Sequence, residues 1–204
     1  MLYNRIMVTA IKNQGDDPME LMEAIYKRRS VRFYTEETVD KDTIEKLIKA
    51  GIQAPSAMNV QPWAFGVIKD KALMQKISDE TKAYLLANIS EKPYLECYRQ
   101  LFSNSEFNIF YHAPVLLTIL AKPEGPFPSC DCNLAAQNVM LAAHALGLGS
   151  CWIGFAQMSL NRPELKEQLG IPKEYTIAAP LVIGHPAKTS PDIVKRDPEI
   201  VFWK

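Results

Sequence analysis

The sequence carries no excess of charge of either sign, because 23 Lys and Arg residues balance 23 Asp and Glu residues among 204. Without a global positive field, we do not expect a dedicated nucleic-acid binder, and any recognition by charge must be local. The sequence also lacks an uninterrupted apolar run of about 18 residues, which a membrane span requires. Its first residues contain no apolar core of a signal peptide. We therefore expect a cytoplasmic protein with neither a membrane nor nucleic acid among its partners.

Motifs for metal binding and for nucleophilic catalysis are also missing. The four cysteines form no C-x-x-C pair, and the three histidines are scattered without ligand spacing. The motifs G-x-x-x-x-G-K-[ST], G-x-S-x-G and H-E-x-x-H are absent as well. We assign no metal site and no catalytic nucleophile or general acid, so a bound cofactor would have to carry any chemistry.

Apolar periodicity predicts helices and strands that follow one another along the chain. Helices are predicted at residues 19–29, 40–53, 71–88, 94–112, 131–146 and 163–169, and strands at residues 63–68, 114–121 and 175–184. We expect Pro180 to interrupt the last strand. Strands separated by helices indicate an α+β or α/β sheet layered with helices. We treat residues 1–18 as an N-terminal extension of uncertain role and residues 19–204 as a single domain.

A local cluster of positive charge lies at the end of the first predicted helix. The segment YKRRSVR contains Lys27, Arg28, Arg29, Ser30 and Arg32, and no acidic residue follows before residue 36. Such a run is typical of a solvated basic surface. The alternative is a phosphate clamp, because guanidinium groups bind a dianion through paired hydrogen bonds.

The segment PSAMNVQPW places Ser56, Asn59 and Gln61 between two prolines, just before a predicted strand. A simple turn would explain this pattern. The alternative is recognition of a heterocycle edge, because a neutral amide supplies both a donor and an acceptor. An arginine on a phosphate together with an amide on a ring describes a mononucleotide-like ligand, for which FMN is the best candidate.

A third segment, GLGSCWIGF, follows the most apolar predicted helix. Its three glycines allow close backbone approach, and Cys151, Trp152 and Ile153 could form a wall beside a flat ring. A helix end followed by a packed strand explains the segment equally well when it is considered alone.

Taken together and in this order, RRSVRFY, APSAMNVQPWAF and AAHALGLGSCWIGF resemble the nitroreductase family of FMN-dependent oxidoreductases. The resemblance covers nearly all of residues 19–203. It implies an α+β sandwich with a central, mostly antiparallel sheet flanked by helices. It also implies an intertwined homodimer with two FMN sites at the interface, each built from both chains.

The resemblance further implies roles for particular residues. Arg28, Arg29, Ser30 and Arg32 would hold the FMN phosphate and ribityl chain, and Lys195 and Arg196 would reach the phosphate from the C-terminal tail. Pro55, Ser56, Ala57, Met58, Asn59 and Gln61 would approach the isoalloxazine from the partner chain. Cys151, Trp152, Ile153 and Gly154 would lie along the ring near N5. Family members commonly carry a polar group near position 153, so here a backbone N–H of Ile153 or Gly154 would replace that contact.

The implied activity is a ping-pong reaction in which NADH or NADPH gives a hydride to FMN and a second acceptor then takes the electrons. Nitroaromatics and quinones are the expected small-molecule acceptors, because such pockets are open and apolar. The same fold also serves reductive dehalogenation, flavin fragmentation and azoline oxidation. A non-catalytic flavin-binding protein is a further alternative, and a basic nucleic-acid-binding module is the least favoured.

Overall fold

The computed structural model describes residues 19–204, so the N-terminal extension lies outside the described residues. Four strands form one sheet in the order β1-β2-β4-β3, and every neighbouring pair is antiparallel. The strands are β1 (Trp63–Ile68), β2 (Val115–Ala121), β3 (Gly149–Trp152) and β4 (Thr176–Gly184). This arrangement confirms the α+β sandwich with an antiparallel sheet.

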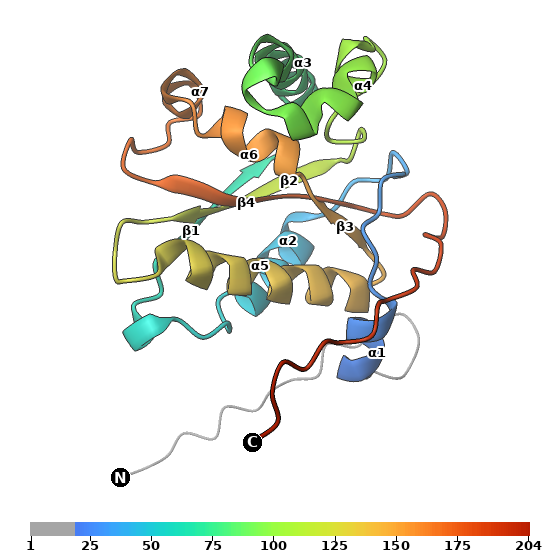
Figure 1. Ribbon diagram of the computed structural model, residues 1–204, viewed down its shortest axis with the longest axis vertical. Coiled ribbons are helices and arrows are strands. Elements are labelled where there is room, and N and C mark those ends of the chain that lie inside the picture. The colour runs from blue at the N-terminus through green and yellow to red at the C-terminus, as the bar shows by residue number, and fades with distance from the viewer. Residues whose placement is uncertain (1–18) are drawn as a thin grey trace.

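Helices cover both faces of the sheet, as Figure 1 shows. One face carries α2 (Lys41–Gly51) and the long α5 (Pro128–Ala145), with α1 (Leu21–Lys27) beside the end of α5. The other face carries α3 (Lys71–Ala87), α4 (Arg99–Ser103), α6 (Gly154–Leu160) and α7 (Pro163–Gln168). Three short 3-10 helices connect these elements, η1 (Ala57–Asn59), η2 (Ile89–Glu91) and η3 (Pro93–Tyr98).

The central strands are buried on both faces, which explains their continuous apolar sequences. In β2, Leu117 and Ile119 pack into the core beneath α5, whereas Leu116 and Leu120 pack into the core beneath α3 and α6. This alternation follows from the two-residue period of a strand. Two hydrophobic cores therefore hold the sheet between its helical layers.

Local signals fix several helix boundaries. Asp40 accepts a hydrogen bond from the Thr43 N–H at 2.8 Å and so caps α2, and Asp70 caps α3 in the same way. Gly147 adopts a φ of +74° immediately after α5, in the left-handed region where a glycine is favoured. The predicted end of this helix at Gly147 is thus confirmed.

The expected interruption at Pro180 does not occur, and β4 runs through it. The Pro180 carbonyl accepts a hydrogen bond from the Ile153 N–H at 2.9 Å. Because the N and C=O groups of one strand residue point to the same side, the proline nitrogen also faces Ile153, immediately past the end of β3. The Ile153 carbonyl instead accepts from the Ala156 N–H at 3.1 Å. No acceptor is left unpaired there, so this inner strand tolerates proline.

The helix predicted over residues 94–112 was wrong beyond its first half. Helix α4 ends at Ser103, and a loop follows up to β2. In this loop Asn104 accepts from the Glu106 N–H at 2.9 Å, and Asn108 accepts from the Phe110 N–H at 2.8 Å. Asparagine side chains that bond to nearby backbone compete with the helical pattern, which is why the helix stops.

The four cysteines are all free thiols, with Cys97 and Cys130 exposed and Cys132 and Cys151 buried. Among residues 19–204, no helix is both long enough and apolar enough to cross a membrane.

Candidate functional site

The basic segment that follows α1 lies against the edge strand β3. Ser30 forms a parallel bridge with Ser150, and the Val31 N–H donates to the Ser150 carbonyl at 3.0 Å. The approach is close, because a Cβ atom added at Gly149 would lie 2.8 Å from the Val31 side chain. Glycine at position 149 therefore allows the arginines on either side of Val31 to lie at the sheet edge.

Arg28 and Arg29 line a cavity of about 520 Å³, which we call the basic cavity. Its other polar lining residues are Lys27, His144, Ser150, Lys188, Thr189 and Ser190. Among residues 19–204, no aspartate or glutamate lines it. A group of cations and hydroxyls around one cavity is suited to a phosphate.

Three buried nitrogen atoms around this cavity have no hydrogen-bond partner among residues 19–204. They are Arg28 Nη1, Arg29 Nε and His144 Nε2. A buried donor without a partner is rare, because its lost contact with water is not replaced. Burial, with the nearby charge of Arg29, also lowers the pKa of Arg28. An anion in the basic cavity would accept hydrogen bonds from these donors. It would also offset the repulsion between the positive charges of Arg28 and Arg29.

The guanidinium of Arg29 is held by its own surroundings. Its Nη1 donates to the Tyr26 carbonyl at 2.5 Å and to the Arg28 carbonyl at 3.1 Å. Its Nη2 lies 3.3 Å from the carboxylate of Asp192 in the C-terminal tail. These contacts fix the group and leave Nε for a ligand.

A second cavity of about 410 Å³, the aromatic cavity, lies beside the end of β3. Cys151, Trp152, Ile153 and Gly154 all line it. Three tyrosines, Phe155 and Met158 also line it. Within the described part of the chain, Arg32 is its one cation and no acid lines it. A flat aromatic ligand with electron-rich oxygen or nitrogen atoms suits this lining.

The structure separates Arg32 from the two preceding arginines. Arg32 lines the aromatic cavity and not the basic cavity, and its guanidinium lies 5.9 Å from the centre of the Tyr111 ring. The segment from Arg28 to Arg32 thus reaches both cavities. The segment places Arg28 at the basic cavity and Arg32 at the aromatic cavity. This arrangement suits a ligand with an anionic group at one end and a ring at the other.

Of the two backbone donors considered near the ring wall, Ile153 is already used. Its N–H bonds to Pro180, whereas the Gly154 N–H is at the first position of α6 and has no partner within the described part of the chain. Gly154 is exposed, and a Cβ atom added there would meet nothing within 4 Å. Gly154 is therefore the available backbone donor in the aromatic cavity.

Cys151 is not an activated nucleophile. Its side chain is buried, and burial raises the pKa of its thiol. A protonated thiol is a poor nucleophile. Within residues 19–204, the acidic, histidine and cysteine side chains also form no group of three that could hold a metal ion.

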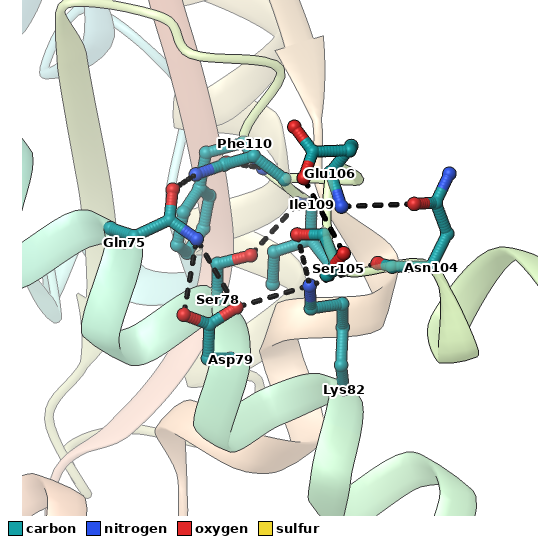
Figure 2. Close-up of polar contacts among 10 residues, drawn as sticks. Gln75, Ser78, Asp79, Lys82, Asn104, Ser105, Glu106, Ile109 and Phe110 are labelled. Atoms are coloured by element: carbon teal, nitrogen blue, oxygen red, sulfur yellow. Dashed lines mark hydrogen bonds and ion pairs between the residues drawn. The ribbon is translucent and has the colours of Figure 1, made fainter.

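The loop that carries Tyr111 into the aromatic cavity is fastened to α3, as Figure 2 shows. Lys82 is only 6% exposed, and its ammonium donates to the carbonyls of Asn104 and Ser105 at 3.2 and 3.4 Å. The same ammonium lies 3.0 Å from Asp79. Ser78 accepts from the Ile109 N–H at 3.0 Å. Helix α3 thereby positions one wall of the aromatic cavity.

Residues 55–61 lie away from both cavities of their own chain. They line neither cavity, and in Figure 1 the teal loop that precedes β1 lies on the opposite side from α1. Met58, Asn59 and Gln61 have φ angles of +53°, +57° and +54°. The Asp131 carboxylate holds this loop by accepting from the Ala57 N–H at 3.2 Å. Left-handed backbone at three non-glycine residues is a strain that is common at binding sites.

The C-terminal tail reaches the basic cavity through residues other than those predicted. Lys195 and Arg196 are exposed and line neither cavity, whereas Lys188, Thr189 and Ser190 line the basic cavity. The sequence reasoning missed Lys188 and His144. Lys188 shortly follows a predicted strand, which was a usable signal. A lone histidine inside an apolar helix gave none.

The chain is similar to a known protein family and to several named proteins. The model of the nitroreductase family matches residues 25–185 of this chain. A provisionally named NADH dehydrogenase/NAD(P)H nitroreductase of Archaeoglobus fulgidus is 31% identical over 179 residues, which cover 87% of this chain and 91% of that protein. A similarly named protein of Methanothermobacter thermautotrophicus is 29% identical, and the match covers 83% of this chain and 79% of that protein. The crystal structure of a nitroreductase with bound FMN from Desulfitobacterium hafniense has a TM-score of 0.76 at 28% identity, covering 91% of this chain and all of that one.

Proposed function

The chain belongs to the nitroreductase family, and from this premise we propose that it binds FMN and transfers electrons from NADH or NADPH to a small-molecule acceptor. The observation that carries the proposal is the set of three buried, unpartnered nitrogen atoms around the basic cavity. A phosphate monoester supplies the oxygen acceptors and the charge that these donors lack.

The two cavities fit the two ends of FMN. Arg28, Arg29 and Ser30 would hold the phosphate end, with Lys188 from the tail. Cys151, Trp152 and Gly154 would form the wall along the ring, and Arg32 would lie at the ring end. This assignment moves Arg32 from the phosphate to the ring.

Bound FMN supplies the redox chemistry, because it accepts a hydride from NAD(P)H and passes electrons to a second substrate. The protein residues bind, orient and exclude water. The positive charge of Arg32 favours negative charge at the ring, and the Gly154 N–H offers a fixed donor. The tyrosines and Phe155 would lie along the bound ring, because they line the same cavity as residues 151–154.

We further propose that the working unit is a homodimer in which the loop of residues 55–61 approaches the ring bound by the partner chain. Exposed apolar side chains gather on α1 and on the tail, namely Leu21, Met22, Tyr26, Val194, Val201, Phe202 and Trp203. The ion pair between Arg29 and Asp192 joins these two segments. Apolar surface of this kind is typical of a protein interface. Lys195 and Arg196 would then act at the partner's phosphate or the interface.

Nitroaromatics and quinones are the acceptors that the aromatic cavity favours, since its lining is aromatic and carries one positive charge. Reductive dehalogenation is the alternative that the same lining permits. An acceptor panel that includes a nitroarene, a quinone and a halophenol would distinguish these reactions.

The test is steady-state oxidation of NADH and NADPH by the purified protein, before and after addition of FMN. We expect activity that requires FMN and parallel double-reciprocal plots when the acceptor is varied. A protein that binds FMN but oxidises neither nucleotide with any acceptor would be a non-catalytic flavin-binding protein. A protein that fails to bind FMN would overturn the proposal.

A further inference from the structure

We propose that His144 is a proton-switched ligand of the phosphate group in the basic cavity, neutral when the cavity is empty and protonated when the dianion is bound. Binding of the phosphate would then take up a proton. The inference rests on the proposed FMN site, and it assigns a role to a residue outside the basic motif of that site.

The position of His144 makes it a third nitrogen donor around one cavity. It lies in the last turn of α5 and lines the basic cavity together with Arg28 and Arg29. Its Nε2 atom is buried and has no hydrogen-bond partner among residues 19–204. Because His144 and the two arginines line one cavity, an anion bound there would interact with all three side chains.

The empty cavity disfavours the charged form of His144. Burial lowers the pKa of this imidazole, and the positive charges of Arg28 and Arg29 lower it further. The buried Nε2 then carries no hydrogen-bond partner and no charge. A dianion in the basic cavity would raise the pKa of His144, because it would neutralise the two arginines and attract the imidazolium.

The other charged groups around His144 do not take over the role of that anion. They are Glu23 and Lys27 on α1 and Lys188 across the basic cavity, and Glu37, Asp40, Lys46 and His185 around a neighbouring cavity that His144 also lines. Each of the three acids has another partner. Glu23 pairs with Lys27 at 2.7 Å, Glu37 lies 3.5 Å from His185, and Asp40 bonds to Thr43. A bound anion is therefore the partner that the imidazolium lacks.

The position at the end of α5 favours the switch. The C-terminal end of a helix carries partial negative charge, which stabilises a protonated histidine there. The two arginines therefore disfavour the protonated form of His144, and the helix end favours it. The arrival of two negative charges is enough to decide the balance between them.

The sign of the pH dependence follows from linkage. A ligand that raises the pKa of His144 binds best at a pH below the raised value and weakens as the pH rises through it. The second pKa of a phosphate monoester is about 6, so the phosphate stays mostly dianionic above about pH 7. A loss of FMN affinity between about pH 7 and pH 8.5 would therefore report on the histidine and not on the phosphate.

The experiment measures the dissociation constant of FMN against pH by quenching of flavin fluorescence, in a buffer without phosphate. For the unmodified protein we expect affinity to fall by roughly threefold or more across this range, and by at most about tenfold per pH unit. His144→Gln keeps a neutral donor and should remove the slope. His112→Asn is the matched control, because His112 lines neither proposed FMN cavity, and it should keep the slope. Riboflavin lacks the phosphate and should bind without the slope.

A second measurement on the unmodified protein does not depend on how the variants fold. The imidazole resonances are titrated by NMR without ligand, with inorganic phosphate and with FMN, and His144→Gln identifies the signal. Both anions should raise the pKa of that signal. A slope that persists in His144→Gln, or a His144 signal that neither anion moves, would overturn the inference while FMN binding stands. Failure to bind FMN, with the pKa still raised by inorganic phosphate, would overturn the proposed function and leave an anion site.

Discussion

Replacement of Arg28 by glutamine separates a binding role from a folding role. Arg28 Nη1 is buried and has no partner, and the pKa of this arginine is lowered by burial and by Arg29. The positive charge is therefore unfavourable in the empty protein and becomes favourable once a phosphate lies beside it. A residue kept only for stability would not be held in such an environment.

The two effects of Arg28→Gln should have opposite signs. A hydrogen bond to a charged group contributes about 1.5–3 kcal/mol, so the dissociation constant of FMN should rise by roughly 10- to 150-fold. The free energy of unfolding of the FMN-free protein should stay the same or rise, because a desolvated cation has been removed from beside another cation.

The assay combines a fluorescence titration of FMN with urea unfolding of the FMN-free protein. Arg162→Gln provides the control, since Arg162 lies over the Tyr84 ring at 5.1 Å and away from both cavities. It should leave FMN affinity unchanged. If Arg28→Gln lowers the stability of the FMN-free protein and leaves FMN affinity intact, the arginine is structural and the reasoning is refuted.

Three further changes test other parts of the site. Arg32→Gln removes the cation that lines the aromatic cavity. The two-electron midpoint potential of bound FMN, measured by dye equilibration, should therefore fall by roughly 30 mV, equivalent to about 1.4 kcal/mol. An unchanged potential would place Arg32 away from the ring. Lys82→Met removes the two bonds that Lys82 makes to the loop that carries Tyr111, and should lower the free energy of unfolding by about 1–3 kcal/mol and raise the KM of the acceptor, while FMN affinity stays the same. Gly149→Ala places a Cβ atom 2.8 Å from Val31, and overpacking of about 1–3 kcal/mol should weaken both folding and FMN binding. Val31→Gly in the same chain removes the Cβ and both Cγ atoms that would clash, so it should restore FMN binding; failure to do so would show that the clash is not the cause.

The apolar segments of the sheet could be predicted from the sequence, most plainly β2, because all seven of its residues are buried. The predicted strand at residues 63–68 has the bounds of β1, and the predicted helix at residues 71–88 differs from α3 by one residue. Pro180 misled the prediction because its effect depends on which neighbour its nitrogen faces, a tertiary property. The helix over residues 94–112 failed because two asparagines bond to local backbone.

The candidate site was predictable to the extent that its residues lie within one continuous motif. The ring-wall residues 151–154 line one cavity together, and Arg28 and Arg29 line another. The position of Arg32 at the aromatic cavity could not be predicted, because it depends on how residues 28–32 lie along β3. His144 could not be found either, since an isolated histidine in a helix acquires meaning only from the arginines packed beside it.

The central claim is that this chain holds FMN and uses it for two-step electron transfer. The most direct test is the visible absorbance spectrum of the FMN-loaded protein under anaerobic conditions, recorded before and after NADH or NADPH and again after a nitroaromatic or a quinone. The account predicts flavin bands that bleach with at least one nucleotide and return with the acceptor. Bands that never bleach, or a colourless protein that FMN cannot reconstitute, would contradict it.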